Sequence, residues 1–71
     1  FNMTASAKKI GQRIVNIRAE RNLTQKDFAK KLKTQSSVVS NWECGRNKPN
    51  KVMLAKISIM TKIPVEKLTE E

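Results

Sequence analysis

The chain has 71 residues and a formal net charge of +9 at neutral pH, from 15 Lys and Arg against six Asp and Glu. This length excludes a second domain and leaves one small core, most readily built from helices. No apolar run approaches the ~20 residues that a membrane-spanning helix needs, and the opening residues lack the pattern of a signal peptide. The charge favours a polyanionic partner, nucleic acid before an anionic membrane surface, although a basic surface can also serve solubility alone.

The residue types that carry catalysis and metal binding are scarce. The chain has no His and a single cysteine, Cys44, which cannot form an internal disulfide and is typical of a reducing compartment. No carboxylates stand at a catalytic spacing, no group of metal ligands occurs, and Cys44 has no evident base beside it. We therefore expect a protein that is not an enzyme and uses neither a cofactor nor a metal. Cys44 is interpreted as an ordinary reduced thiol, with oxidant sensing as the alternative.

The two ends of the chain are set apart from the predicted fold. Phe1 and Asn2 precede Met3, which is typical of an expression scar followed by the native start. We expect residues 1–6 to be disordered, residues 7–69 to form the domain, and residues 70–71 to be a short C-terminal tail.

Hydrophobic spacing predicts two helices in the first half of the chain. Ser6 is the expected N-cap of a helix over about 7–21. Thr24, with Asp27 as a capping-box acid, is the expected N-cap of a shorter helix over 25–32. The residues expected to face the core are Ile10, Ile14 and Ile17 in the first helix and Phe28, Ala29 and Leu32 in the second.

Three more short helices are predicted in the second half. The third covers residues 36–43 and ends before Gly45, a residue that permits the backbone to turn. After a loop over 45–49, Asn50 is the expected cap of the fourth helix and Pro64 opens the fifth. The expected core residues are Val39 and Trp42, then Leu54, Ile57 and Met60, and the fifth helix carries Val65 and Leu68. No strand pattern competes, so the predicted fold class is all-α with five helices.

The second and third helices stand on either side of a short break, the arrangement of a helix-turn-helix unit. Phe28 and Leu32 on one helix can contact Val39 and Trp42 on the other. The tight turn is usually built on glycine, but here it contains Lys33. A residue other than glycine in the left-handed conformation costs about 1 kcal/mol.

The outward face of the third helix is short and polar. Projection at about 100° per residue places Ser37, Ser40, Asn41 and Cys44 opposite the core, with Ser36 at the flank. A face that enters the major groove of DNA must come close to base edges. Ser and Asn offer small hydrogen-bonding groups there, and Asn can make a bidentate contact with adenine. Val38 either borders the core or touches a thymine methyl group.

Cations stand before and after this uncharged face. They are Lys26, Lys30, Lys31 and Lys33 before it, and Arg46, Lys48 and Lys51 after it. Each one alone is a common surface residue, but together they are placed to contact the two phosphate backbones that border a major groove. The pattern therefore favours double-stranded DNA as the partner.

These residues also resemble a known family. The motifs are I-x-x-I-R from Ile14 to Arg18, L-T-Q-K-D-F-A from Leu23 to Ala29, V-S-N-W-E-C-G-R-N-K-P from Val39 to Pro49, and the closing I-P-V-E-K-L. Their order and spacing resemble the Xre/Cro-type helix-turn-helix DNA-binding domains, over nearly the whole chain. The resemblance implies a compact five-helix, phage-repressor-like domain with a central helix-turn-helix, in which the third helix recognises DNA.

The resemblance also implies roles for single residues. Gln25 would anchor a phosphate and support the recognition helix, while Arg18 and Glu43 would form a structural ion pair. With the projected face added, the predicted base-contacting residues are Ser36, Ser37, Ser40 and Asn41. The predicted backbone-contacting residues are Gln25, Lys26, Lys33, Gln35, Arg46 and Lys48.

Some positions depart from the family pattern. Lys33 and Lys62 stand where the family commonly has glycine, and Thr61 replaces a usual leucine. Serines replace longer Gln or Arg side chains on the recognition helix. Because serine discriminates poorly between base edges, we expect the shape of the DNA to carry more of the specificity.

A second resemblance suggests an alternative function. The segments T-Q-K-D-F-A, G-R-N-K-P-N and V-M-L-A-K-I are similar to the C-terminal domain of multiprotein bridging factor, a coactivator that links an activator to the TATA-binding protein. A native start at Met3 would leave no room for the N-terminal half of that family. The closing I-P-V-E-K-L-T-E-E is more similar to a small bacterial or phage repressor.

The sequence therefore predicts a sequence-specific, double-stranded DNA-binding transcription regulator, with repression as its expected action. We expect a homodimer, at least on DNA, with an interface on the fourth and fifth helices that includes Ile59 and Val65. We expect no membrane association. The expected compartment is the cytoplasm, at the nucleoid, for a bacterial or phage protein and the nucleus for the coactivator alternative, which would also have partners in the transcription machinery.

Overall fold

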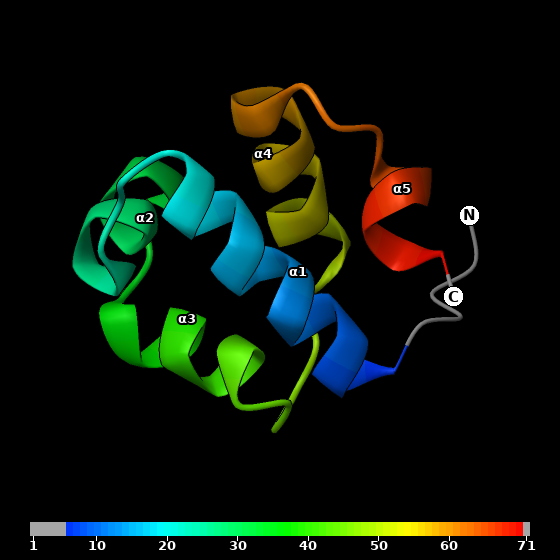
Figure 1. The fold of residues 1–71 in the computed structure, drawn as a ribbon, viewed down its shortest axis with the longest axis horizontal. Helices are drawn as coiled ribbons and strands as arrows, with labels where there is room; N and C mark the ends of the chain where they lie inside the picture. Colours follow the sequence, from blue (N-terminus) through cyan, green and yellow to red (C-terminus); the bar gives the residue numbers. More distant parts are fainter. Residues whose placement is uncertain (1–5, 71) are drawn as a thin grey trace.

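The computed structural model describes residues 6–70, which form five α-helices joined by turns and one longer loop (Figure 1). The helices are α1 Ala7–Glu20, α2 Gln25–Leu32, α3 Ser36–Glu43, α4 Lys51–Thr61 and α5 Val65–Thr69. Residues 6–70 contain no strand, and the predicted all-α class is confirmed. Of the N-terminus predicted to be disordered, residues 1–6 with an expression scar at 1–2, all but Ser6 lies outside the described residues, as does the last residue of the predicted tail.

Three helices begin at the capping residues that the sequence indicates. The side-chain oxygens of Ser6 and Asn50 each accept a hydrogen bond from the backbone N–H three residues further on, at 3.1 and 2.9 Å. Thr24 and Asp27 form the reciprocal capping box at the start of α2. Hydrogen bonds from the backbone and the hydroxyl of Thr24 hold the pKa of the Asp27 carboxyl below its usual range. At the start of α3, Gln35 makes no such side-chain bond.

Two helices end at a lysine in the left-handed conformation. Lys33 follows α2 at φ 59° and ψ 44°, and Lys62 follows α4 at φ 61° and ψ 23°. The N–H of Lys33 donates to the carbonyl of Lys30, and the next N–H, of Thr34, donates to the carbonyl of Ala29, at 3.1 and 2.9 Å. This bond pattern is a Schellman motif, which glycine usually closes. The predicted tight turn between α2 and α3 is therefore present, with a lysine at the position where glycine is usual.

We expect Lys33→Gly to raise the free energy of unfolding by about 1 kcal/mol, because it relieves the contact between Cβ and the backbone in the left-handed conformation. Chemical denaturation at neutral pH measures the change. The matched control is Lys31→Gly, an exposed lysine inside α2, which should lower stability by about 1 kcal/mol. Equal losses in the two variants would show that Lys33 is not strained.

The core lies where the helices meet. Its buried apolar residues are Ile10, Ile14, Ile17, Phe28, Ala29, Leu32, Val39, Trp42, Leu54, Ile57 and Leu68. The prediction was wrong for Met60, which is only half-buried at the edge of this cluster, as is Val65. On α4 the buried line passes instead through Thr61, whose hydroxyl donates to the carbonyl of Ile57 at 2.7 Å and so satisfies its polar group inside the helix. A threonine can therefore occupy the place of the expected leucine.

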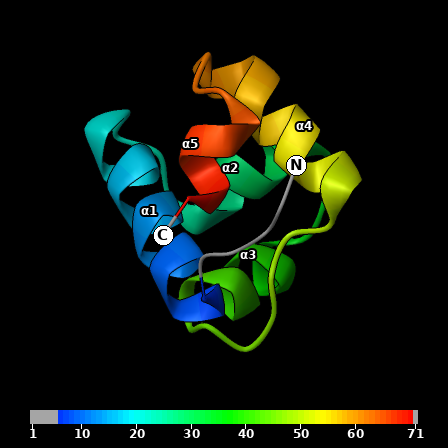
Figure 2. The same cartoon turned by 90° about the vertical axis from the view of Figure 1, so that its right-hand side faces the viewer.

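At Gly11, α1 packs directly against the backbone of α3. A Cβ at this position would collide with the carbonyl oxygen of Trp42 and would press against the backbone of Glu43. Figure 1 shows α1 crossing above α3, and Figure 2 shows the N-terminal end of α1 beside α3; in both views α4 lies in the upper part of the molecule. The absence of a side chain at Gly11 therefore sets how closely α3 can pack on α1.

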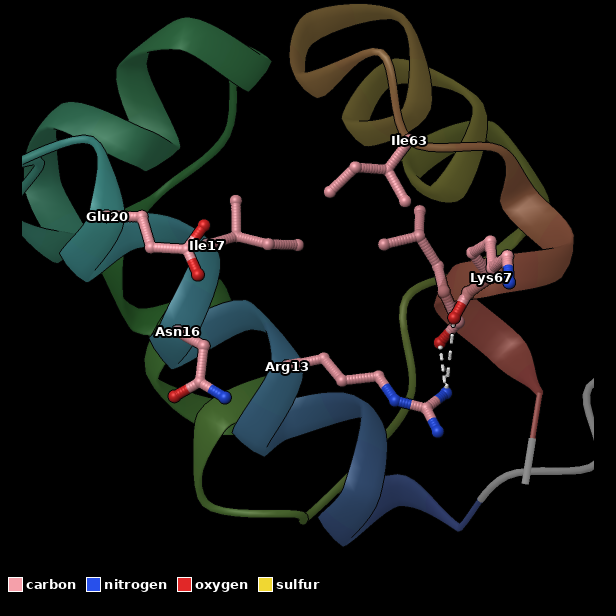
Figure 3. A pocket seen from close by; sticks show the side chains of 7 residues that line it. Arg13, Asn16, Ile17, Glu20, Ile63 and Lys67 are labelled. Carbon is pink, nitrogen blue, oxygen red and sulfur yellow. Dashed lines mark hydrogen bonds between the residues drawn. The ribbon is translucent and has the colours of Figure 1, made fainter.

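Arg13 attaches the short C-terminal helix to α1. Its guanidinium donates to the carbonyl oxygen of Leu68 at 2.9 Å and lies 3.5 Å from that of Lys67 (Figure 3). A shallow hollow of about 190 Å³ lies beside this contact, with Ile17 and Ile63 on opposite walls. Because α5 has only five residues, this side-chain cap and the burial of Leu68 hold it in place.

Candidate nucleic-acid interface

The predicted base-contacting residues share one side of α3. Ser36 and Ser37 are exposed, and Ser40 and Asn41 are half-buried. Cys44, an exposed free thiol, lies at the end of the same helix. The opposite side of α3 is buried in the core. The helix therefore presents small, uncharged, hydrogen-bonding side chains outward, as the projection predicts.

The one acidic residue of α3 points away from this outward face. The Glu43 carboxylate accepts two hydrogen bonds from Arg18 on α1, with Nε–Oε2 at 2.8 Å and Nη2–Oε1 at 3.0 Å. The remaining Nη1 of Arg18 donates to the carbonyl oxygen of Leu23 at 3.0 Å. The two charged side chains are only 21% and 7% exposed, so each compensates the charge of the other at that depth.

Gln25 adds the second helix to this network. Its side-chain Nε2 donates to Oε1 of Glu43 at 2.9 Å. Burial raises the pKa of Glu43, but the hydrogen bonds from Arg18 and Gln25, with the charge of Arg18, outweigh it and hold the pKa below its usual range. The bond to Glu43 raises the pKa of Arg18. One carboxylate thus fixes α3 against both α1 and α2, while the phosphate contact of Gln25 stays a prediction.

Predicted base-contacting and backbone-contacting residues meet at both ends of α3. The guanidinium of Arg46 donates to the side-chain oxygen of Asn41 at 3.3 Å. The hydroxyl of Ser37 donates to the side-chain oxygen of Gln35 at 3.4 Å. Both bonds are long and exposed, so they orient the side chains weakly. The Asn41 amide keeps its two N–H donors and one lone pair available to another molecule.

A hollow lies between α2 and the start of α3. It is lined by Lys26, Ala29, Lys30, Thr34, Gln35, Ser36 and Ser37. Lys33 is exposed in the turn beside it, and Arg46 and Lys48 are exposed in the loop after α3. Pro49, which is fully buried, holds this loop against the domain. Positive charge therefore borders α3 at its beginning and at its end.

One member of the predicted bracket of cations lies elsewhere. Lys31 does not line this hollow but two others, one with Arg21 and Met60 and one that it shares with Lys30. The reason is helical geometry: Lys31 is five residues from Lys26, which turns it about 140° away around the helix. The cations that border α3 on α2 are Lys26 and Lys30.

The structure adds a cation that the sequence reasoning missed. The backbone of Lys8, at the start of α1, lies within 3.5 Å of the place a Cβ on Gly45 would take, with Gly45 at φ +78°. Lys8 and Lys9 are exposed, and Lys8 therefore stands beside the loop that carries Arg46. No local pattern could reveal this, because the two segments are far apart in the sequence.

Within residues 6–70, no group of three or more His, Cys, Asp or Glu side chains is placed to hold a metal ion. In the same part of the chain, no helix has the length and the apolar character needed to cross a membrane. Among these residues the polar outer side of α3, together with the cations around it, forms the candidate site.

α2, the turn and α3 form one unit, and Glu43 fixes this unit to α1. This arrangement defines the helix-turn-helix class of proteins. The chain belongs to the helix-turn-helix family, whose match extends over residues 14–68. The match begins inside α1 and ends inside α5, so it includes both the buried ion-pair network and the outer face. The resemblance predicted from the sequence is confirmed.

Curated relatives agree with the second predicted resemblance. Multiprotein-bridging factor 1 of Debaryomyces hansenii is 40% identical over 48 residues, which are 68% of this chain and 32% of that protein. Multiprotein-bridging factor 1 of Candida albicans has the same identity and coverage. The endothelial differentiation-related factor 1 homolog of Danio rerio is 35% identical over 49 residues, 69% of this chain and 34% of that protein. The chain spans about a third of the length of these relatives.

Proposed function

We propose that this chain is a regulator of transcription that binds double-stranded DNA with α3 in the major groove. The observation that carries the proposal is the outer side of α3, which is polar and uncharged while cations stand at both of its ends. Base edges in the major groove require a close approach and small hydrogen-bonding groups, whereas phosphates attract the cations. Membership of the helix-turn-helix family supports the same partner.

Each predicted residue then has a distinct task. Asn41 reads adenine through its amide, and the serines of α3 let the helix lie close to the bases. Gln25 and Lys26, at the start of α2, bind one phosphate backbone, and Arg46 and Lys48 bind the other. Because serines discriminate weakly, DNA shape contributes to the choice of sequence.

We propose two copies of the chain on each site. A single α3 makes few base contacts, so a roughly palindromic site, with recognition helices about 34 Å apart, supplies the missing specificity. Of the interface expected on α4 and α5, we retain the part on α5, where Val65 is half-buried, and not Ile59, because the lysines of α4 would face each other in a two-fold contact. Occupation of such a site near a promoter would repress transcription, at the nucleoid of a bacterial or phage-infected cell.

Selection of duplexes from a random library tests the proposal. The expected result is enrichment of one palindromic motif, with an affinity that falls steeply between about 50 mM and about 200 mM salt. Titration of the enriched duplex against the natural chain, followed by fluorescence anisotropy, gives both quantities. Lack of any enriched motif, together with salt-insensitive binding, would contradict DNA recognition by α3.

Asn41→Ala and Lys26→Ala should weaken binding in different ways. Asn41→Ala is expected to cost about 1–3 kcal/mol on the preferred duplex and little on a scrambled one. Lys26→Ala is expected to weaken both duplexes alike and to lower the salt slope by about 1. Thermal unfolding of both variants is the control, because neither residue is in the core. The reverse pattern would refute the assigned roles.

A bridging function is the second candidate, and the identity to multiprotein-bridging factors favours it. In that case the domain would act in the nucleus as a coactivator, joining an activator to the TATA-binding protein. Purified TATA-binding protein, without DNA, is the appropriate probe. Tight binding to it, with no duplex enriched in the selection experiment, would support this function over the first one.

A further inference from the structure

α4 has an apolar side that nothing within residues 6–70 covers. Val52 and Ile59 are the two large apolar side chains that this part of the chain leaves exposed, by 62% and 79%. They are seven residues apart, which places them only about 20° apart around the helix. Ala55 is also exposed and lies between them at helical spacing. These three residues form one row, which we call the α4 stripe.

The α4 stripe is opposite the side of α4 that enters the core. The inward residues are Leu54, Ile57 and Thr61. By helical projection, their centre is about 180° from the midpoint of Val52 and Ile59. A surface helix normally has one apolar stripe, which faces the core, and presents polar residues on its opposite side. The uncovered row therefore indicates a second helix-packing surface that this chain leaves without a partner.

All the charged residues of α4 around the α4 stripe are positive. The cations are Lys51 and Lys56 in α4 and Lys62 directly after it; the ammonium of Lys56 also donates to the carbonyl oxygen of Leu32 at 3.4 Å. No acidic residue occurs anywhere in the segment 45–64. The next acids along the chain are Glu66 and Glu70, on α5 beyond the turn. A molecule that lies along α4 therefore meets an apolar row with a positively charged border.

We propose that the α4 stripe is a docking site for an acidic amphipathic helix of a partner protein. Residues at i, i+3 and i+7 are the contact row that one helix offers to another. The small side chain of Ala55 at the centre lets the partner's backbone come close. Acidic residues beside the partner's apolar row would pair with the lysines of α4, which steers association and selects against basic helices.

Charge argues against a second copy of this chain as the occupant. In a two-fold contact the same surface appears on both sides, so the lysines of one α4 would face those of the other. A membrane surface is also disfavoured, because α4 is only about 16 Å long and its inward side is fixed in the core. A negatively charged partner helix is not repelled by the lysines and needs to cover only the short exposed side of α4.

Docking on the α4 stripe is independent of the proposed DNA contact. Figures 1 and 2 both place α3 in the lower part of the molecule and α4 in the upper part. The predicted base-contacting residues are all on α3, and of the cations predicted to border that helix only Lys51 is on α4. The domain could then hold DNA with one helix and a protein with another at the same time.

Titration of a designed helical peptide into the isotope-labelled chain, without DNA, tests the proposal by NMR. The peptide has about 14 residues, with leucines at i, i+3 and i+7 and glutamates on both borders. The expected result is saturable binding, with the largest amide shifts at Val52, Ala55 and Ile59. A second peptide with lysines in place of the glutamates should bind at least about tenfold more weakly.

Two pairs of variants complete the test. Ile59→Ser should weaken binding at least about tenfold, whereas Lys9→Ser, an exposed site on α1, should leave it unchanged. Lys51→Glu with Lys62→Glu should reverse the preference between the two peptides. The control is Lys8→Glu with Lys9→Glu, which changes the net charge equally on another helix and should leave the preference unchanged.

Several results would overturn the proposal. They are equal binding of both peptides, no saturable binding of the acidic one, and shifts centred on α3. Self-association of the chain that depends on Ile59 would instead make a second copy the occupant. Binding to anionic vesicles that Ile59→Ser abolishes would make it a membrane surface. None of these results bears on the selection of DNA duplexes, so the two proposals fail separately.

Discussion

Gly11→Ala is expected to lower the free energy of unfolding by about 3 kcal/mol. The new Cβ would overlap the carbonyl oxygen of Trp42, which belongs to the backbone of α3 and cannot move as a flexible side chain can. Overpacking at such a crossing typically costs 1–3 kcal/mol and sometimes more. The collision would also push α3 away from α1, and DNA affinity should therefore fall together with stability.

The sign of this effect makes it a sharp test. Inside a helix, replacement of glycine by alanine ordinarily gains about 1 kcal/mol from helix propensity alone. The matched control is Gln12→Ala, the neighbouring and exposed position of α1, which should be neutral or slightly stabilising. Urea denaturation followed by circular dichroism measures both variants. A Gly11→Ala chain as stable as the natural one would mean that α1 and α3 are further apart than described.

Arg18→Met is expected to destabilise the domain by about 3 kcal/mol at neutral pH. The variant leaves the carboxylate of Glu43, whose side chain is 7% exposed, without its cation and with Gln25 as its remaining side-chain donor. An unpaired charge at such depth is one of the most costly defects in a small domain. The comparison variant is Arg46→Met, which removes an exposed arginine and should change stability by less than about 0.5 kcal/mol.

The cost of Arg18→Met should shrink as the pH falls. In the natural chain the folded-state pKa of Glu43 lies below the unfolded value of about 4.3. The ion pair therefore contributes fully above that value and loses its contribution as the pH falls through the lower folded-state pKa. In the variant, burial acts without the opposing cation and raises the pKa of Glu43, so protonation removes the defect. Parallel stability curves for the two proteins from pH 7 to about pH 3 would refute this role.

Replacement of both residues of the ion pair separates the contribution of the pair from the cost of leaving one charge unpaired. Arg18→Met with Glu43→Leu removes both charges and should recover part of the loss, because no buried charge then remains unpaired. Its DNA affinity is expected to stay below that of the natural chain, since α3 would no longer be fixed through Glu43 to α1 and α2. Recovery of both properties would mean that the network has no part in orienting α3.

The sequence predicted helix bounds well wherever the signal was local. Ser6, Thr24 and Asn50 cap helices through contacts that span three residues, and such contacts are visible in the sequence alone. The errors occurred where the signal was tertiary. Met60 matched the apolar spacing, but the neighbouring Thr61 is the residue turned inward, because its hydroxyl is satisfied within its own helix.

The candidate site was predicted less completely than the fold. The outer residues of α3 follow from its helical period, so their common side could be derived from spacing. The contact between Arg46 and Asn41 could not, because it crosses the end of a helix where the period stops. Lys8 was missed for a different reason, since only the folded chain brings the start of α1 to Gly45. Contacts between distant segments depend on packing, which no local pattern describes.

The two sides of α3 have separate tasks, and this separation makes the domain adaptable. The residues that hold the helix in place, Val39, Trp42 and Glu43, all lie on its inner side. Ser36, Ser37, Ser40 and Asn41 lie on the other side and contribute little to the core. A library randomised at the four outer positions should therefore consist mainly of folded proteins. Evolution or an engineer can change the target of such a helix without rebuilding the scaffold that carries it.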